Sequence, residues 1–94
     1  MITKKAIVQA ATEVAGRAPT ARNVSPQMVD RRHPRGLIGR TLHAVGLTPK
    51  QISSLEGNRR YEQFLNPAAT KWIREASIRA SKGNTWSEVV TTTR

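Results

Sequence analysis

Three helix-start signals of the same kind are spread along this chain. Each is a small polar residue followed directly by proline, and they are Ser25-Pro26, Thr48-Pro49 and Asn66-Pro67. The polar side chain can accept a hydrogen bond from a free N–H group of the first helical turn. Proline suits the first helical position because the N–H that it lacks would have no partner there. Three such starts in 94 residues predict an all-α fold.

Apolar residues at helical spacing extend these signals into helices. The longest helix is expected from Asn66-Pro67 to about Ser81, closed by Gly83, with Trp72 on its apolar face. Other helices are expected over residues 3–15, 26–32, 36–45 and 49–55, with one helical turn in residues 61–65. The segment that follows the longest helix has two interpretations. Its Val and Thr residues favour extended structure, and the alternative is a short helix over residues 85–90.

The length predicts a single domain over residues 1–94. We divide it into an N-terminal helix (1–16), a basic arm rich in Pro and Arg (17–35), a helical core (36–83) and a tail (84–94). Hydrophobic residues make up 37% of the chain and several of them are alanines, so the core is small. A domain with a core of this size is marginally stable alone. We therefore expect that a homo-oligomer, a larger assembly or bound nucleic acid can complete the structure.

The charge is strongly positive and points to a polyanion as partner. The chain has 16 Lys and Arg against 6 Asp and Glu, which gives a net charge of +10. Most of the cations are arginines, whose planar guanidinium suits bidentate contacts with phosphates and base edges. Residues 17–40 alone contain six Arg and one Asp, so this segment carries half of the excess charge. These features predict a nucleic-acid partner.

Residues 46–60 combine a glycine turn, a capped helix start and a basic end. Gly46 can adopt a positive φ where one helix turns into the next. Leu47 and Ile52 are then expected to pack on Leu42 and Val45. The outward polar side chains and the arginines that follow are Thr48, Lys50, Gln51, Ser53, Ser54, Arg59 and Arg60. Such positions reach base edges when a helix enters the major groove, where Gln can read adenine and Lys can read guanine.

This stretch resembles the recognition helix of the phage-repressor-like helix-turn-helix family. The matching residues are Gly46, Leu47, Thr48, Ile52, Ser53, Glu56, Gly57 and Arg59. Gly57 precedes Asn58 where the family has the reverse order, and Thr41-Leu42 stands where the family has a Leu-Ala pair. An arm also replaces the usual first helix. The resemblance implies a helix-turn-helix DNA-binding protein of phage or bacterial type, with DNA favoured over RNA. A plain helical hairpin is the alternative interpretation.

The basic arm supports more than one function. Its candidate nucleic-acid contacts, with one arginine just beyond it, are Arg22, Arg31, Arg32, Arg35 and Arg40. They can lie along phosphates or enter a minor groove. A ribosomal or virion protein uses such an arm in the same way on RNA, DNA or a neighbouring subunit. Two alternatives therefore remain, a structural component of a virion or ribonucleoprotein and a small basic inhibitor that docks on an acidic host protein.

Several classes of function are not expected. The six acidic residues are scattered, the two histidines lack metal-ligand spacing, and no phosphate-binding glycine loop or nucleophile elbow is present. We therefore predict a non-enzymatic protein without metal or cofactor. The chain has no cysteine, no apolar run of the roughly 18 to 20 residues that span a bilayer, and no apolar signal-peptide region after Lys4 and Lys5. No membrane partner is expected, and the expected location is the cytoplasm, or a virion if a phage encodes the chain.

Overall fold

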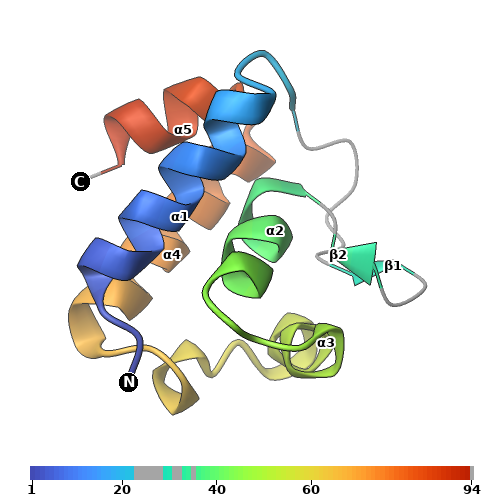
Figure 1. Cartoon of the computed structure of the whole chain (residues 1–94), viewed down its shortest axis with the longest axis vertical. Coiled ribbons are helices and arrows are strands. Elements are labelled where there is room, and N and C mark those ends of the chain that lie inside the picture. The colour runs from blue at the N-terminus through green and yellow to red at the C-terminus, as the bar shows by residue number, and fades with distance from the viewer. Residues whose placement is uncertain (23–28, 31–32, 35, 94) are drawn as a thin grey trace.

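The structure is a computed structural model that describes residues 1–22, 29–30, 33–34 and 36–93. In this part of the chain the helices are α1 (Lys4–Arg17), α2 (Gly36–Ala44), α3 (Pro49–Asn58), α4 (Pro67–Ser81) and α5 (Trp86–Thr92). A 3-10 turn, η1 (Tyr61–Gln63), and the two-residue strands β1 (Val29–Asp30) and β2 (His33–Pro34) complete the described elements (Figure 1). The predicted all-α class is confirmed.

Local capping explains where the long helices begin. The side chain of Thr3 accepts a hydrogen bond of 3.3 Å from the N–H of Ala6, and that of Asn66 accepts one of 2.8 Å from Ala69. Thr48 caps α3 in the same way. The predicted helices over residues 3–15, 36–45, 49–55 and 67–81 are all present, although α3 runs three residues further than expected. Polar caps therefore located the starts of α1, α3 and α4 correctly.

The prediction of a helix over residues 26–32 is wrong for the residues of this segment that the structure describes. Val29–Asp30 forms β1, which pairs antiparallel with β2 in the register Val29 to Pro34 and Asp30 to His33. A residue that precedes proline is driven toward extended backbone, which favours a strand at His33. Both strands contact α3. The remaining residues of 26–32 lie outside the described part of the chain.

The extended interpretation of the tail is also wrong, because residues 86–92 form helix α5. Thr85 caps this helix, and Glu88 completes a capping box. The N–H of Trp86 donates to the carbonyl of Ala21 at 2.8 Å, and that of Ser87 donates to the carbonyl of Pro19 at 3.2 Å. The start of the basic arm thus satisfies N–H groups of α5 that a helix leaves free at its N-terminus.

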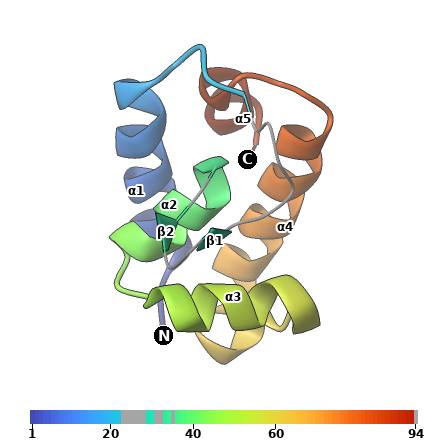
Figure 2. The same ribbon diagram turned by 90° about the vertical axis from the view of Figure 1, so that its right-hand side faces the viewer.

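One hydrophobic core joins all five helices in the described residues. Figures 1 and 2 show α1 beside α2, and α1 also contacts α4 and α5. Ile7 and Ala11 of α1 and Val89 of α5 are buried in this core, which therefore extends beyond the segment 36–83 that we took as the helical core. Trp72 is 1% exposed, and its Nε1 donates to the carbonyl of Thr93 at 3.1 Å.

The beginning of the chain is tied to the segment before α4. The N–H of Ile2 donates to the carbonyl of Phe64, and the N–H of Asn66 donates to the carbonyl of Ile2, both at 2.9 Å. These bonds form a parallel bridge between Ile2 and Leu65. Among the described residues, no helix has the length and apolar character that crossing a membrane requires.

Candidate nucleic-acid interface

A tight glycine turn joins α2 to α3. Gly46 has a φ of 108°, and its N–H donates to the carbonyl of His43 at 3.0 Å. The N–H of Leu47 donates to the carbonyl of Leu42 at 3.2 Å, and both leucine side chains are buried. This paired pattern with its apolar contact is a Schellman motif, which requires the left-handed backbone that glycine adopts readily. Sequence and structure therefore agree that a glycine turn joins two helices at this position.

Helix α3 presents one polar side to solvent. Ile52 and Leu55 are fully buried on its inner side. Lys50, Ser53, Ser54 and Gly57 are exposed at the spacing of a single helix face. Figures 1 and 2 place α3 at the end of the molecule opposite α5. The outer side of α3 thus offers one cation, two hydroxyl groups and a bare stretch of backbone to a partner.

Thr48 and Gln51 are less available than the sequence suggested. The N–H of Thr48 donates to Gln51 Oε1 at 2.8 Å, and the N–H of Gln51 donates to Thr48 Oγ1 at 3.2 Å. Gln51 is also half-buried. A bidentate contact with adenine uses both the oxygen and the nitrogen of the side-chain amide. Gln51 would have to break its capping bond to make that contact.

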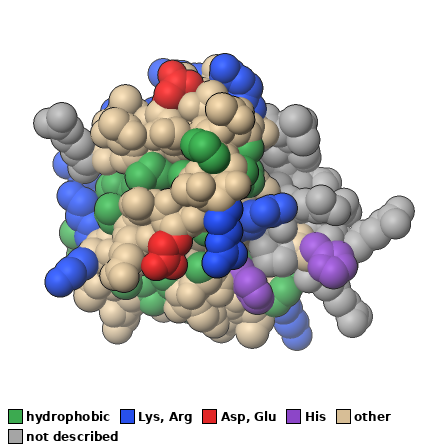
Figure 3. Space-filling model, turned by 45° about the horizontal axis from the view of Figure 1, so that its top comes forward, with side chains coloured by type: hydrophobic (Ala, Val, Ile, Leu, Met, Phe, Trp, Pro, Cys, Tyr) green, Lys and Arg blue, Asp and Glu red, His purple; other side chains and the backbone are tan. Residues whose placement is uncertain are grey.

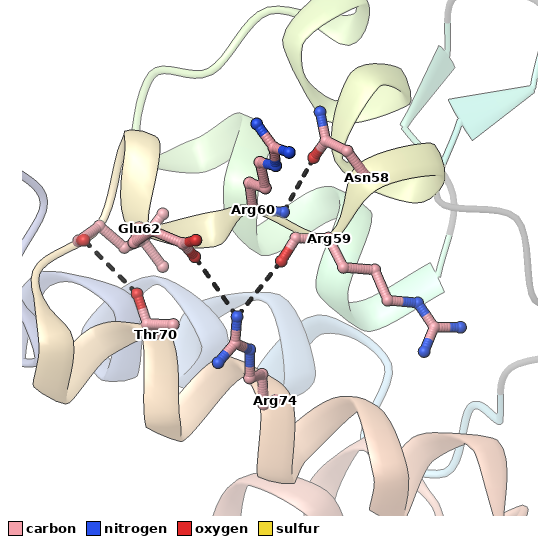
Figure 4. Close-up of polar contacts among 7 residues, drawn as sticks. Asn58, Arg59, Arg60, Glu62, Thr70 and Arg74 are labelled. Carbon is pink, nitrogen blue, oxygen red and sulfur yellow. Dashed lines mark hydrogen bonds and ion pairs between the residues drawn. The ribbon is translucent and has the colours of Figure 1, made fainter.

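The exit of α3 carries two exposed arginines. Arg59 has a φ of 55°, and its N–H donates to the carbonyl of Leu55 at 2.9 Å. The N–H of Arg60 donates to Asn58 Oδ1 at 2.8 Å. Figure 4 shows the guanidinium groups of Arg59 and Arg60 pointing away from each other. The end of α3 therefore presents two separate positive charges to solvent.

Sequence reasoning missed Arg74, which α4 brings to the same corner. Its Nη2 donates to the carbonyl of Arg59 at 3.4 Å and to Glu62 Oε2 at 3.3 Å (Figure 4). The side chains of Arg74 and Glu62 are 54% and 60% exposed. The sequence contains one signal that could have identified Arg74, which is its position outside the apolar face of its helix. Nothing local to Arg74 indicates that it lies beside a residue 15 positions earlier.

Tyr61 anchors this corner to the core. Burial raises the pKa of the Tyr61 hydroxyl, and a hydrogen bond with Ser77 and the nearby charges of Arg59 and Arg74 act in the opposite direction. The phenol is therefore neutral at physiological pH, and its hydrogen bond joins η1 to α4. This anchor holds the backbone that follows Arg60 against the helix that carries Arg74.

Of the arginines predicted in and near the basic arm, the two that the structure describes do not lie beside α3. The guanidinium of Arg22 donates to the carbonyl of Gly83, and that of Arg40 lies 5.6 Å from the centre of the Trp86 ring. Both are exposed, but they lie near α5, at the other end of the molecule from α3. Three further predicted contacts, Arg31, Arg32 and Arg35, lie outside the described residues.

Figure 3 shows how charged side chains are arranged on one face of the molecule. On the face drawn in Figure 3, Lys and Arg side chains occupy several separate places, with acidic side chains between some of them. Within the described part of the chain, no group of three His, Asp or Glu side chains is placed to hold a metal ion. Comparison with protein-family models, curated proteins and solved structures found no match for this chain. What the site can bind must therefore be inferred from its geometry and charge.

Proposed function

We propose that this protein binds duplex DNA without catalysing a reaction, and that the exposed side of α3 lies against the double helix. The observation that carries this proposal is which residues α3 exposes to solvent. Lys50, Ser53, Ser54 and Gly57 are all exposed, and none of them is acidic or bulky. Arg59 and Arg60 follow directly and are also exposed. An α-helix with this surface fits the width of a major groove and leaves its cations beside the phosphates.

The capping bonds change which side chains are best placed to read bases. Gln51 is held by Thr48, whereas the Lys50 ammonium and the hydroxyls of Ser53 and Ser54 lie on the open side. Lysine can donate to guanine, and serine can donate to or accept from several bases. We therefore expect base contacts to come mainly from Lys50 and the two serines. Such a protein acts where DNA is present, in the cytoplasm or inside a virion.

Fluorescence anisotropy with a labelled 20-base-pair duplex tests the proposal. We expect nanomolar to micromolar affinity at low salt and a steep, linear fall of log affinity with log salt, because contacts with phosphates release counterions. Lys50→Ala should weaken binding, whereas Lys82→Ala removes the same charge at the far end of α4 and should have a smaller effect. Undetectable binding at low salt would rule out the proposed function.

A structural component of a nucleoprotein assembly is the second candidate, favoured by one apolar side chain. Ile78 on α4 is 55% exposed. Lys71, Arg74 and Lys82 are exposed on the same helix or at its end. A neighbouring protein subunit would bury this apolar side chain while the cations beside it contact nucleic acid. Fixed stoichiometry in a purified particle, with no preference among DNA sequences, would support this candidate over groove reading.

A further inference from the structure

The last turn of α3 contains a glycine that the fold itself does not require. Gly57 lies inside the helix and is not among the residues with positive φ. A Cβ atom added there would meet nothing within 4 Å. Alanine would stabilise a helix at such a position, because glycine loses more backbone entropy on folding. Neither backbone conformation nor packing within the described residues explains the glycine.

Two residues later the opposite mismatch occurs. Arg59 adopts a left-handed conformation with a φ of 55°, where glycine would be free of steric strain. The chain thus has glycine where a helix favours alanine, and arginine where the backbone favours glycine. Residues that break local preferences are concentrated at functional sites, where a contact with a partner offsets the lost stability.

The charges around this turn suit a phosphate backbone. Arg59, Arg60 and Arg74 come from the end of α3 and from α4, their side chains point in different directions, and Glu62 is paired with Arg74. The C-terminal end of a helix normally repels anions because its carbonyl groups are free. Here the guanidinium of Arg74 donates a hydrogen bond to the carbonyl of Arg59, and the N–H of Arg59 donates one to the carbonyl of Leu55. The repulsion is therefore reduced at this end of α3.

We propose that the end of α3 is the contact with the sugar-phosphate backbone of the bound duplex. Gly57 lets the nucleic-acid strand approach the helix backbone, Arg59 and Arg60 bind phosphates on either side, and Arg74 adds a third positive charge from α4. This inference rests on the proposed function, gives Gly57 a specific role in it and extends the site to Arg74. It also makes the left-handed Arg59 a binding residue rather than a helix cap alone.

Gly57→Ala gives the sharpest test, because Gly16→Ala is a matched control. Gly16 is likewise exposed, is the second-last residue of its helix, and has open space where a Cβ would lie. Each substitution should raise the melting temperature by about 4 °C. Gly57→Ala should nevertheless weaken duplex binding about tenfold, whereas Gly16→Ala should leave the affinity unchanged. Equal affinities for the two variants would overturn the inference.

Arg59→Gly likewise distinguishes a binding role of the Arg59 side chain from its role as a helix cap, because stability and affinity should change in opposite directions. Glycine relieves the left-handed strain, so the melting temperature should rise while the affinity falls and the salt slope decreases by about one unit. Glu62→Gln should strengthen binding, because it removes the acidic partner of Arg74. If Lys50→Ala weakens binding but Gly57→Ala and Arg59→Gly do not, the inference fails and the proposed function stands. If the unmodified protein binds no duplex, both fail.

Discussion

Thr48 and Gln51 exchange two hydrogen bonds at the start of α3, one from each backbone N–H to the other's side chain. The pair satisfies two N–H groups that the helix would otherwise leave free. It also occupies the side-chain oxygen of Gln51. A residue whose position suggests reading adenine therefore has a structural role in the free protein.

Replacing Gln51 tests this role. Gln51→Ala should lower the free energy of unfolding by about 0.5 to 1 kcal/mol, because one capping bond is lost. Gln51→Glu should restore it, since glutamate completes the same capping box and places negative charge near the helix N-terminus. Urea denaturation measures both changes. If folded Gln51→Ala also loses discrimination between DNA sequences, the side chain must leave its cap to read a base.

Thr41 offers a stabilising substitution. It is fully buried in α2, and its hydroxyl is the one buried side-chain polar atom in the described residues without a hydrogen-bond partner. Thr41→Val keeps the branched shape and removes the unsatisfied group, so stability should rise by about 1 kcal/mol. Thr41→Ser keeps the hydroxyl and loses a methyl group, and should destabilise the fold. A loss of stability in the valine variant would mean that the hydroxyl has a partner.

Trp72 should be the most sensitive residue of the core. Trp72→Ala should lower the free energy of unfolding by about 3 to 5 kcal/mol, because a large side chain that is 1% exposed is replaced by a cavity. Trp72→Phe should cost less, since it keeps much of the apolar volume and loses the hydrogen bond to Thr93. Denaturant titration compares the two. A change below about 1 kcal/mol for alanine is incompatible with the buried position.

Glu88 should make α5 sensitive to acid. The backbone N–H and then the hydroxyl of Thr85 donate to its carboxylate, at 3.0 and 2.8 Å, and these bonds hold the pKa of Glu88 below its ordinary 4.5. The folded state therefore binds this proton less readily than the unfolded state. The stabilisation is present above the ordinary pKa and is lost as pH falls through the lower, folded pKa.

Comparing the unmodified protein with Glu88→Gln separates the pH-dependent stabilisation by Glu88 from that by the other carboxylates. Glutamine keeps a side-chain oxygen for the capping box and does not titrate. Between about pH 5 and pH 3, the melting temperature of the unmodified protein should fall further than that of the variant. Parallel curves would show that the Thr85 bonds do not couple α5 to pH.

Short-range signals in the sequence correctly located most of the helices. Thr3, Thr48 and Asn66 each satisfy an N–H group within three residues, so their effect does not depend on the rest of the fold. The turn between α2 and α3 is likewise local, because the N–H of Gly46 bonds to His43 and that of Leu47 bonds to Leu42, three and five positions earlier. The apolar spacing then predicted that Ile52, Leu55 and Trp72 are buried, and they are.

Contacts between distant segments settled the rest. Of the two interpretations of the tail, the short helix is present. Its own Thr85–Glu88 capping box favours it, and Ala21 and Pro19 supply acceptors for its first N–H groups while the core buries Val89. Arg74 reaches the carbonyl of Arg59 only because the turn η1, which follows α3, lies against α4. Propensity and spacing describe a few neighbouring residues, whereas these outcomes depend on hydrogen bonds and burial that exist only once the helices have packed together.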